Sequence, residues 1–366
     1  MKNNLIVFFL RVIRCLAEIR QLGNPYGKSP CLEEKMEEGL ATYKYASEDG
    51  EVRVWHLGPV LATALYGGAL INAKNQVYDR FVWFPWGLSL HPVFSFPYIG
   101  IKKAVLNKVI YLITPEAKGN YYHWMTDLLP RLLLIKKSSL PDFQERILIL
   151  HSTKKPYETD TLDLLDISIK NVVRIKTFET VEANDLVVAD HHSNERSFPN
   201  WKKILLNEFK EQSVTPLLPE DHYKRVYLYR GNQKVRRLIG EDHLVKVLTE
   251  RRFQMVDPQK LSLAEQIAIL KQARIVVAMH GAALTNVIFC EENSCVIELR
   301  STKNSPEHYS SIAKAYRLRM ETVYLTPTRL RENRHDANKE NLKLTNESLR
   351  ELLSRIEEYE HILQLS

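Results

Sequence analysis

The stretch RIVVAMHGAALTNVIF, residues 274–289, decides the fold of the second half of this chain. Its apolar run Ile275–Met279 predicts a short strand buried on both faces. A turn without bulky side chains follows and opens a helix, and it consists of Gly281, Ala282 and Ala283. Backbone N–H groups at a helix N-terminus favour an anion, and His280 stands at the carboxyl end of the strand, where open α/β sheets bind ligands. The stretch predicts a phosphate-binding turn, and a tight connection without a ligand is the alternative.

A basic segment, HYKRVYLYRGNQKVRR, precedes this stretch at residues 222–237 and contains no acidic residue. Residues 226–229 predict a strand, and Arg230 then begins a basic loop at its carboxyl end. Guanidinium groups grip phosphate through two parallel hydrogen bonds. We therefore expect Arg230, with Arg236 or Arg237, to hold a diphosphate at the His280 turn. The alternatives are a solvated basic surface and a nucleic-acid patch.

The chain between these two segments alternates between helix and strand. Residues 241–252 have a helical pattern, residues 253–256 predict a strand, and Ser262 with Glu265 forms a capping box that starts another helix. This alternation predicts a Rossmann-like domain. Neither GxGxxG nor GxxxxGK[ST] occurs, which argues against a dinucleotide fold of that type and against a P-loop NTPase.

Glu298 lies near the end of the next predicted strand, residues 295–299. A carboxylate at this position can accept hydrogen bonds from ribose hydroxyls. An ion pair with Arg300 or with the basic loop is the alternative.

A second informative segment is GNYYHWMTDLLPRLLLI, residues 119–135, in which Asn120 is a good N-cap. His123, Asp127 and Arg131 are spaced four residues apart, which places them on one helix face. Such a line can form a charge relay in which the imidazole or the carboxylate takes a proton from a hydroxyl nucleophile. A polar stripe that only supports the helix is the alternative. Pro130 predicts a kink.

These segments together resemble glycosyltransferase family 61. The resemblance rests on NYYHWMTDLLPRL, YLYRGNQKVRRLIGED, LSLAEQIAILKQARIVVAMHGAALTNVIF and VIEL, and it spans residues 119–299. The family includes plant xylan xylosyl- and arabinosyltransferases, animal O-linked N-acetylglucosamine transferases and bacterial capsule enzymes. One departure concerns the basic loop, which is usually followed by Asn-Glu and is here followed by Gly240-Glu241.

The resemblance implies an α/β fold of the GT-B type, with two Rossmann-like domains facing across a cleft. It implies inverting transfer from a nucleotide diphosphate sugar, with a UDP sugar expected, to a glycan or lipid-linked glycan hydroxyl. His123 and Asp127 are then expected to be catalytic, with Asn120 and Arg131 as support on the acceptor side. The expected nucleotide-sugar ligands are Arg230, Arg236, Arg237, His280, Gly281, Ala282, Ala283, Asn286 and Glu298. We expect no obligatory divalent ion or other cofactor, since the basic groups and a helix N-terminus can neutralise the leaving diphosphate.

Two other functions fit the same sequence. One is polysaccharide pyruvyl transfer on the same two-domain plan, and the other is a non-enzymatic module that binds nucleic acid or glycan. The net charge of +7 calls for an anionic partner, but a nucleotide, an acidic glycan and an anionic membrane would all satisfy it.

The length of 366 residues suits two domains of about 150 residues each. We expect an N-terminal amphipathic segment at 1–50, an acceptor-side domain at 51–212 and a linker at 213–222. The nucleotide-sugar domain follows at 223–342, and a C-terminal helix at 343–366 is expected to brace the first domain. Strands of the first domain are predicted at 52–55, 105–112, 146–150, 172–175 and 186–189.

The location is predicted to be cytoplasmic, with peripheral contact to the inner membrane through the N-terminal segment. Four cysteines without a CxxC pair indicate a reducing compartment and neither a zinc site nor a disulfide scaffold. The apolar run at residues 5–10 is too short to span a bilayer. Its neighbours Arg11 and Arg14 suit an anionic inner leaflet, and docking on the first domain is the alternative.

Overall fold

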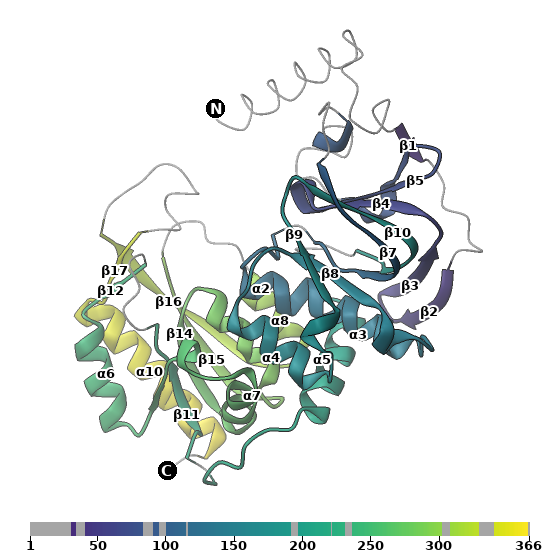
Figure 1. Ribbon diagram of the computed structural model, residues 1–366. Coiled ribbons are helices and arrows are strands. Elements are labelled where there is room, and N and C mark those ends of the chain that lie inside the picture. The colour runs from purple at the N-terminus through teal and green to yellow at the C-terminus, as the bar shows by residue number, and fades with distance from the viewer. Residues whose placement is uncertain are drawn as a thin grey trace. The chain divides into compact units, whose positions relative to one another are not determined.

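The computed structural model describes residues 31–33, 41–82, 91–94, 100–114, 116–191, 197–220, 222–230, 236–301, 308–328 and 340–364. The chain separates into two compact units, residues 1–193 and residues 194–366. Each unit contains its own sheet with helices, which confirms the α/β class (Figure 1). Of the predicted N-terminal amphipathic segment at 1–50, residues 1–30 and 34–40 lie outside the described residues, whereas Cys31–Glu33 and Ala41–Ser47 form strands of the first sheet.

The second unit is built on a seven-stranded sheet among the described residues, in the order β12-β17-β16-β15-β14-β11-β13. Its strands are β11 (Arg225–Leu228), β12 (Leu238–Ile239), β13 (Gln254–Val256), β14 (Ile275–Met279), β15 (Cys295–Ser301), β16 (Arg319–Pro327) and β17 (Leu342–Lys343). The five strands from β13 to β16 are mutually parallel, whereas β17 runs antiparallel to β16. All five residues of β14 are buried, as its continuous apolar run predicts.

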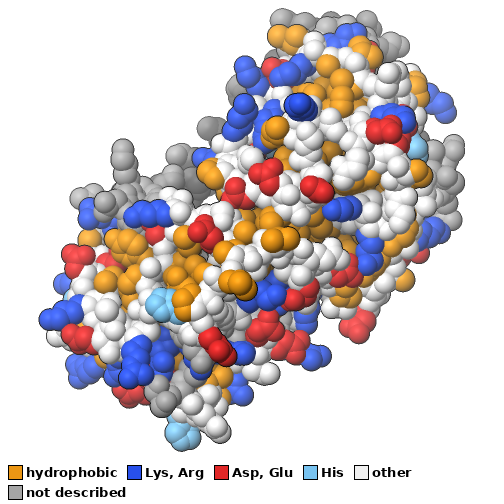
Figure 2. All heavy atoms as spheres, turned by 60° about the horizontal axis from the view of Figure 1, so that its bottom comes forward, with side chains coloured by type: hydrophobic (Ala, Val, Ile, Leu, Met, Phe, Trp, Pro, Cys, Tyr) orange, Lys and Arg blue, Asp and Glu red, His pale blue; other side chains and the backbone are white. Residues whose placement is uncertain are grey.

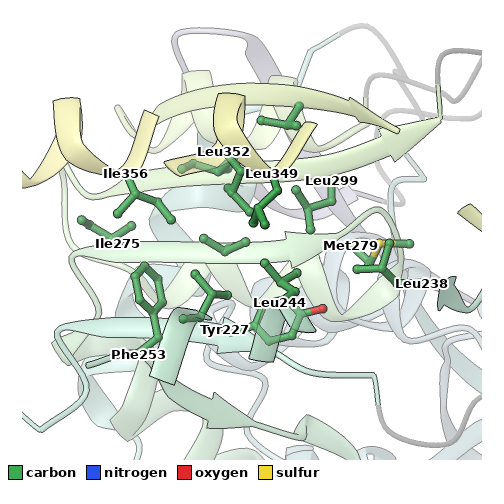
Figure 3. Close-up of a cluster of buried hydrophobic side chains, with 14 of the residues drawn as sticks. Tyr227, Leu238, Leu244, Phe253, Ile275, Met279, Leu299, Leu349, Leu352 and Ile356 are labelled. Atoms are coloured by element: carbon green, nitrogen blue, oxygen red, sulfur yellow. The ribbon is translucent and has the colours of Figure 1, made fainter. Parts of the chain in front are cut away.

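Helices cover both faces of this sheet (Figure 1). On one face, α6 (Glu241–Glu250) and α10 (Asn346–Leu363) contribute Leu244, Leu248, Leu352 and Ile356 to a buried cluster with the strands. Figure 3 shows Leu352 and Ile356 directed toward the strand residues of that cluster. On the other face, α5 (Asn200–Gln212), α7 (Leu263–Gln272), α8 (His308–Ala315) and the 3₁₀ helix η10 (Ala282–Phe289) pack together. The predicted capping box of α7, Ser262 with Glu265, is present.

The strand order places a ligand-binding edge between β11 and β14. The chain leaves β11 for β13 on one side and then returns to β14 on the other side of β11. This reversal is a topological switch point, and open α/β sheets bind ligands at the carboxyl ends of the strands that flank it. Arg230 follows β11 and His280 follows β14, so both residues come from the loops at this edge.

Two features of the second unit differ from the expected domain plan. The division lies at Ser193 and Asn194, before α5, so residues 213–222 join α5 to β11 within the second unit. The C-terminal helix α10 was expected to brace the first domain. It packs instead on the sheet of its own unit, because its apolar stripe of Leu349, Leu352 and Ile356 enters the cluster built on β14 and β15.

The first unit contains a ten-stranded mixed sheet among the described residues. Its strands are β1 (Cys31–Glu33), β2 (Ala41–Ser47), β3 (Gly50–Leu57), β4 (Val60–Thr63), β5 (Ala69–Asn72), β6 (Gln76–Tyr78), β7 (Ile101–Tyr111), β8 (Ile147–His151), β9 (Val172–Ile175) and β10 (Glu179–Ala189). The order is β1-β6-β5-β4-β10-β7-β8-β9, and β2 and β3 extend from β10. The run β10-β7-β8-β9 is parallel, and the neighbours β3 and β4 are antiparallel to β10. The predicted Rossmann-like character therefore holds for the parallel part alone.

The predicted His123 helix connects β7 to β8 and contains a change of helical type. It consists of α2 (Tyr121–His123), a π-helical turn (Trp124–Leu128) and α3 (Leu129–Lys137). Pro130 lies at the start of α3, where its missing N–H is accommodated by the preceding π turn. A further helix, α4 (Pro156–Leu164), connects β8 to β9. Short 3₁₀ turns occur at Leu65–Gly67, Asp79–Phe81, Pro92–Phe94, Phe143–Glu145, Ile169–Asn171 and Pro258–Lys260.

Candidate functional site

The loops after β11 and β14 meet at Gly281. A Cβ atom placed on Gly281 would lie 3.8 Å from Cζ of Arg230 and 3.9 Å from Nη1 of Arg236. Gly281 is buried, and because it has no side chain, two guanidinium groups lie close to the backbone of the turn. Arg230 also donates from Nη1 to the backbone carbonyl of Arg236, at 3.4 Å. The structure therefore brings the basic loop that begins at Arg230 close to the turn after His280.

The two guanidinium groups carry positive charge into a partly buried environment. Burial lowers the pKa of Arg230 from its ordinary value, and the neighbouring charge of Arg236 lowers it further. Burial likewise lowers the pKa of Arg236. A bound anion would offset this unfavourable concentration of charge, and Arg is well suited to bidentate contacts with phosphate. Arg237 differs, because its side chain is exposed and its backbone N–H donates to Oδ1 of Asn341.

His280 is held by Glu298 at the carboxyl ends of β14 and β15. Nδ1 of His280 lies 2.5 Å from Oε1 of Glu298, whose side chain is 3% exposed. The second oxygen of Glu298 lies 3.8 Å from Nη1 of Arg300. The ring of Tyr309 packs edge-on against His280, with 5.2 Å between centroids. Both oxygens of Glu298 thus face positive or hydrogen-donating groups, and no hydrogen bond of Nε2 of His280 is recorded among the described residues.

The turn that follows His280 opens η10. Leu284 donates its N–H to the carbonyl of Gly281 at 2.9 Å, while Ala282 is exposed and Ala283 half-buried. Asn286 has a different position, since it is fully buried and its side-chain amide donates to Oε1 of Gln266 on α7 at 2.8 Å. Asn286 therefore lies in the interior, where its hydrogen bond to Gln266 connects η10 to α7.

A pocket of about 230 Å³ adjoins these residues. It is lined by Tyr229, Arg230, Arg236, Arg237, Leu238, Ile239, Gly240, Glu241, Asp242 and Met279. Glu241 accepts a hydrogen bond from Oη of the buried Tyr227 at 2.7 Å. Burial raises the pKa of the Glu241 carboxyl, and Tyr227 and Arg230 partly oppose this effect. The position of Glu241 in the sequence suggests only an acidic residue that starts a helix, so a role in the pocket could not be predicted from it.

The backbone at Gly240 explains why the chain can have Gly240-Glu241 where the family usually has Asn-Glu. It precedes α6 with φ 94° and ψ 11°, in the left-handed region. Glycine and asparagine are the two residues that adopt this conformation most readily. The substitution therefore keeps the backbone geometry that positions Glu241.

In the first unit, His123 lies between two carboxylates. Its Nδ1 lies 2.7 Å from Oδ2 of Asp127, and its Nε2 lies 2.8 Å from Oε2 of Glu116. Asn120 caps the helix through its side-chain oxygen, which accepts from the N–H of Tyr122. An ionised carboxylate only accepts hydrogen bonds, so both ring nitrogens of His123 carry protons when Asp127 and Glu116 are ionised. Burial lowers the pKa of His123, but Asp127 and Glu116 outweigh it and raise the pKa to about 9.

Arg131 does not extend this cluster in the way that its spacing suggests. Its Nε and Nη2 donate to the carbonyl of Ala189, and its Nη1 donates to the carbonyl of Ile113. These carbonyls lie at and just beyond the ends of β10 and β7. Burial lowers the pKa of Arg131 to about 10. Arg131 therefore connects two strand ends beneath the helix, whereas Glu116, on the loop after β7, is the partner of His123 that the spacing did not reveal.

Residues 121–297 match the family model Glycosyltransferase 61. The matched region contains His123 and Asp127 at one end and the Arg230 and His280 loops toward the other. The chain is also 24% identical over 256 residues to the EGF domain-specific O-linked N-acetylglucosamine transferase of Drosophila melanogaster. That match covers 63% of this chain and 48% of the relative, so the chain spans about half of the relative's length.

The structure also bears on membrane contact, metal binding and the cysteines. No helix among the described residues is long and apolar enough to cross a membrane. Within the same residues, no group of three or more His, Cys, Asp or Glu side chains is arranged to hold a metal ion. Cys290 and Cys295 are buried free thiols. Acidic and basic side chains are interspersed on the face of the protein drawn in Figure 2.

Proposed function

We propose that this chain is an inverting glycosyltransferase that moves a sugar from a nucleotide diphosphate sugar, a UDP sugar in the first instance, to a hydroxyl of a glycan or lipid-linked glycan. The single observation that carries the proposal is the meeting of Arg230, Arg236 and the side-chain-free Gly281 at a switch point of the second sheet. The match to Glycosyltransferase 61 supports the class of reaction.

The diphosphate is assigned to the second unit. Arg230 and Arg236 provide bidentate donors, and the turn that begins at Gly281 provides backbone N–H groups. His280 can add a hydrogen bond from Nε2, because Glu298 fixes the other ring nitrogen. These groups would stabilise the negative charge that develops on the leaving nucleoside diphosphate, which is the largest electrostatic demand of the reaction.

The acceptor is assigned to the first unit. The acceptor oxygen attacks the anomeric carbon from the face opposite the diphosphate, and a new carbon–oxygen bond forms. The bond from the anomeric carbon to the β-phosphate oxygen breaks, and the nucleoside diphosphate leaves with the electron pair. The configuration inverts, and the hydroxyl proton must pass to a base.

Asp127 is the base in this proposal, and His123 is its positioning partner. His123 cannot accept a proton while both of its ring nitrogens donate to carboxylates. Asp127 is fixed on the π turn with a side chain that is 16% exposed, whereas Glu116 is 61% exposed on a loop. A base acts best when its position is fixed, which favours Asp127. The proposed acceptor, a glycan or lipid-linked glycan hydroxyl, is inferred from the family resemblance. The specificity for EGF domains belongs to the Drosophila relative and is not part of this proposal.

A panel of nucleotide sugars tests the donor assignment through stabilisation against heat. A UDP sugar should raise the melting temperature in a concentration-dependent way, and an oligonucleotide of equal charge should not. Stabilisation by the oligonucleotide alone would favour a nucleic-acid module and overturn the proposal.

The variants His123→Ala and Asp127→Asn test the acceptor side. Both should keep UDP affinity and lose transfer, and their effects should be non-additive if the two residues act as a unit. The matched control is Asp163→Asn, because Asp163 is an exposed residue of α4 in the same unit. Full transfer by both site variants would return His123 and Asp127 to helix support.

A further inference from the structure

The pocket beside Arg230 contains a carboxylate that the proposed function has not used. Glu241 opens α6, and one of its oxygens accepts the hydrogen bond from Tyr227. Tyr227 belongs to the buried cluster, and Figure 3 shows its hydroxyl directed out of that cluster toward the end where Leu238 and Met279 lie. Both of those residues line the pocket. The core of the second unit therefore holds Glu241 at the pocket wall.

A carboxylate at the start of a helix has an ordinary explanation, which is favourable interaction with the helix dipole. Asp242 already provides an acid in the same turn at an exposed position, where it costs little desolvation. Glu241 is half-buried, and Tyr227 orients one oxygen while the other makes no hydrogen bond within the described part of the chain. Interaction with the helix dipole does not require a half-buried carboxylate with one oriented oxygen. A ligand with hydroxyl groups, in contrast, could donate hydrogen bonds to such a carboxylate.

Glu298 cannot fill the same role, although its sequence position suggested a ribose contact. Its side chain is 3% exposed, and its oxygens face His280 and Arg300. A ribose would have to displace one of these partners from a buried carboxylate, which is costly. Glu241 is the carboxylate that lines the pocket next to the diphosphate-binding arginines.

We propose that Glu241 binds the 2′- and 3′-hydroxyl groups of the donor's ribose, and that the pocket between Arg230 and α6 is the nucleoside subsite. This inference rests on the proposed function. A vicinal diol presents two donors to one carboxylate. The volume of about 230 Å³ is below the range of about 300–1,000 Å³ that holds a whole drug-sized ligand. It therefore suits one part of a nucleotide sugar, and Arg230 lines both this pocket and the Gly281 turn.

Calorimetric titrations with UDP, GDP and their 2′,3′-dideoxy counterparts test the inference. The wild-type protein should bind the better ribonucleotide about ten- to a hundredfold more tightly than its dideoxy counterpart, because two charge-assisted hydrogen bonds are lost. Glu241→Gln should weaken ribonucleotide binding and lower the ratio of the two affinities, because the amide keeps one accepting oxygen but loses the charge and the second acceptor. The matched control is Glu250→Gln, the same change at an exposed residue at the far end of α6 that does not line the pocket, and it should leave the wild-type ratio unchanged.

The outcomes separate the two proposals. Equal binding of ribo- and dideoxynucleotides by the wild type, or an unchanged ratio in Glu241→Gln, overturns the role of Glu241 and leaves the proposed function standing. Failure of wild-type protein to bind either UDP or GDP overturns the proposed function itself. A melting curve of Glu241→Gln with and without inorganic pyrophosphate shows whether the arginine site remains intact. If pyrophosphate no longer stabilises that variant, Glu241 supports the arginines and the ribose assignment is wrong.

Discussion

The protonation state of His123 offers a quantitative prediction. Its pKa is raised from the ordinary 6.5 to about 9 by Asp127 and Glu116. One pKa unit corresponds to about 1.4 kcal/mol, so the folded protein gains roughly 3 kcal/mol from the imidazolium. Because the pKa is raised on folding, this stability is fully present below pH 6.5 and is lost as the pH rises through about 9.

Two measurements test this prediction with the variant His123→Gln as reference. The pH titration of the His123 ring by NMR should have its midpoint near pH 9. The stability difference between the wild type and His123→Gln should be largest near pH 6 and should shrink by about 2 to 3 kcal/mol by pH 10. Glu116→Gln should move the midpoint downward, because one of the two carboxylates is then neutral. A wild-type midpoint near 6.5 would show that the imidazole is neutral at physiological pH and would restore it as the candidate base.

Three further predictions concern the second unit. Arg230→Ala should weaken UDP binding by about ten- to a hundredfold in calorimetry without lowering the melting temperature, because a partly buried charge is removed; unchanged affinity would end the assignment. Gly281→Val should fold, since the backbone there is extended (φ 160°), but should lose UDP binding because its methyl groups crowd the two guanidinium groups; lost stability with normal binding would make the turn merely structural. Glu298→Gln should weaken UDP binding by up to about tenfold, because His280 loses the carboxylate that orients its ring. If this variant bound UDP and its dideoxy counterpart equally well, Glu298 and not Glu241 would be the residue that contacts the ribose.

The sequence predicted best those elements whose signals are local. The buried strand β14 and the capping box at Ser262 and Glu265 follow from short patterns, and both are present. The approach of Arg230 to Gly281 follows from a general property of parallel sheets, because loops at the carboxyl ends of neighbouring strands lie together.

The remaining features depend on contacts that spacing does not encode. Glu116 is an exposed loop residue, and only the path of the loop after β7 brings it to His123. The i, i+4 spacing of Asp127 and Arg131 suggests a pair, but Arg131 is buried under the helix, where two strand-end carbonyls accept its hydrogen bonds. The pairing of Glu298 with His280 depends on the register between β15 and β14.

The differences from the expected domain plan lie where tertiary packing decides. The amphipathic pattern of α10 identifies a helix with one apolar face, but it does not say which sheet that face covers. In the first unit, the antiparallel strands β4 to β6 are only three or four residues long. Segments this short carry too few alternations to be distinguished from loops.

A crystal structure of the protein with UDP is the most direct test of the diphosphate assignment. We expect the diphosphate within hydrogen-bond distance of Arg230, Arg236 and the backbone N–H groups of the turn after His280, with the ribose directed toward Glu241. UDP bound with its diphosphate away from Arg230 and the Gly281 turn would overturn that assignment.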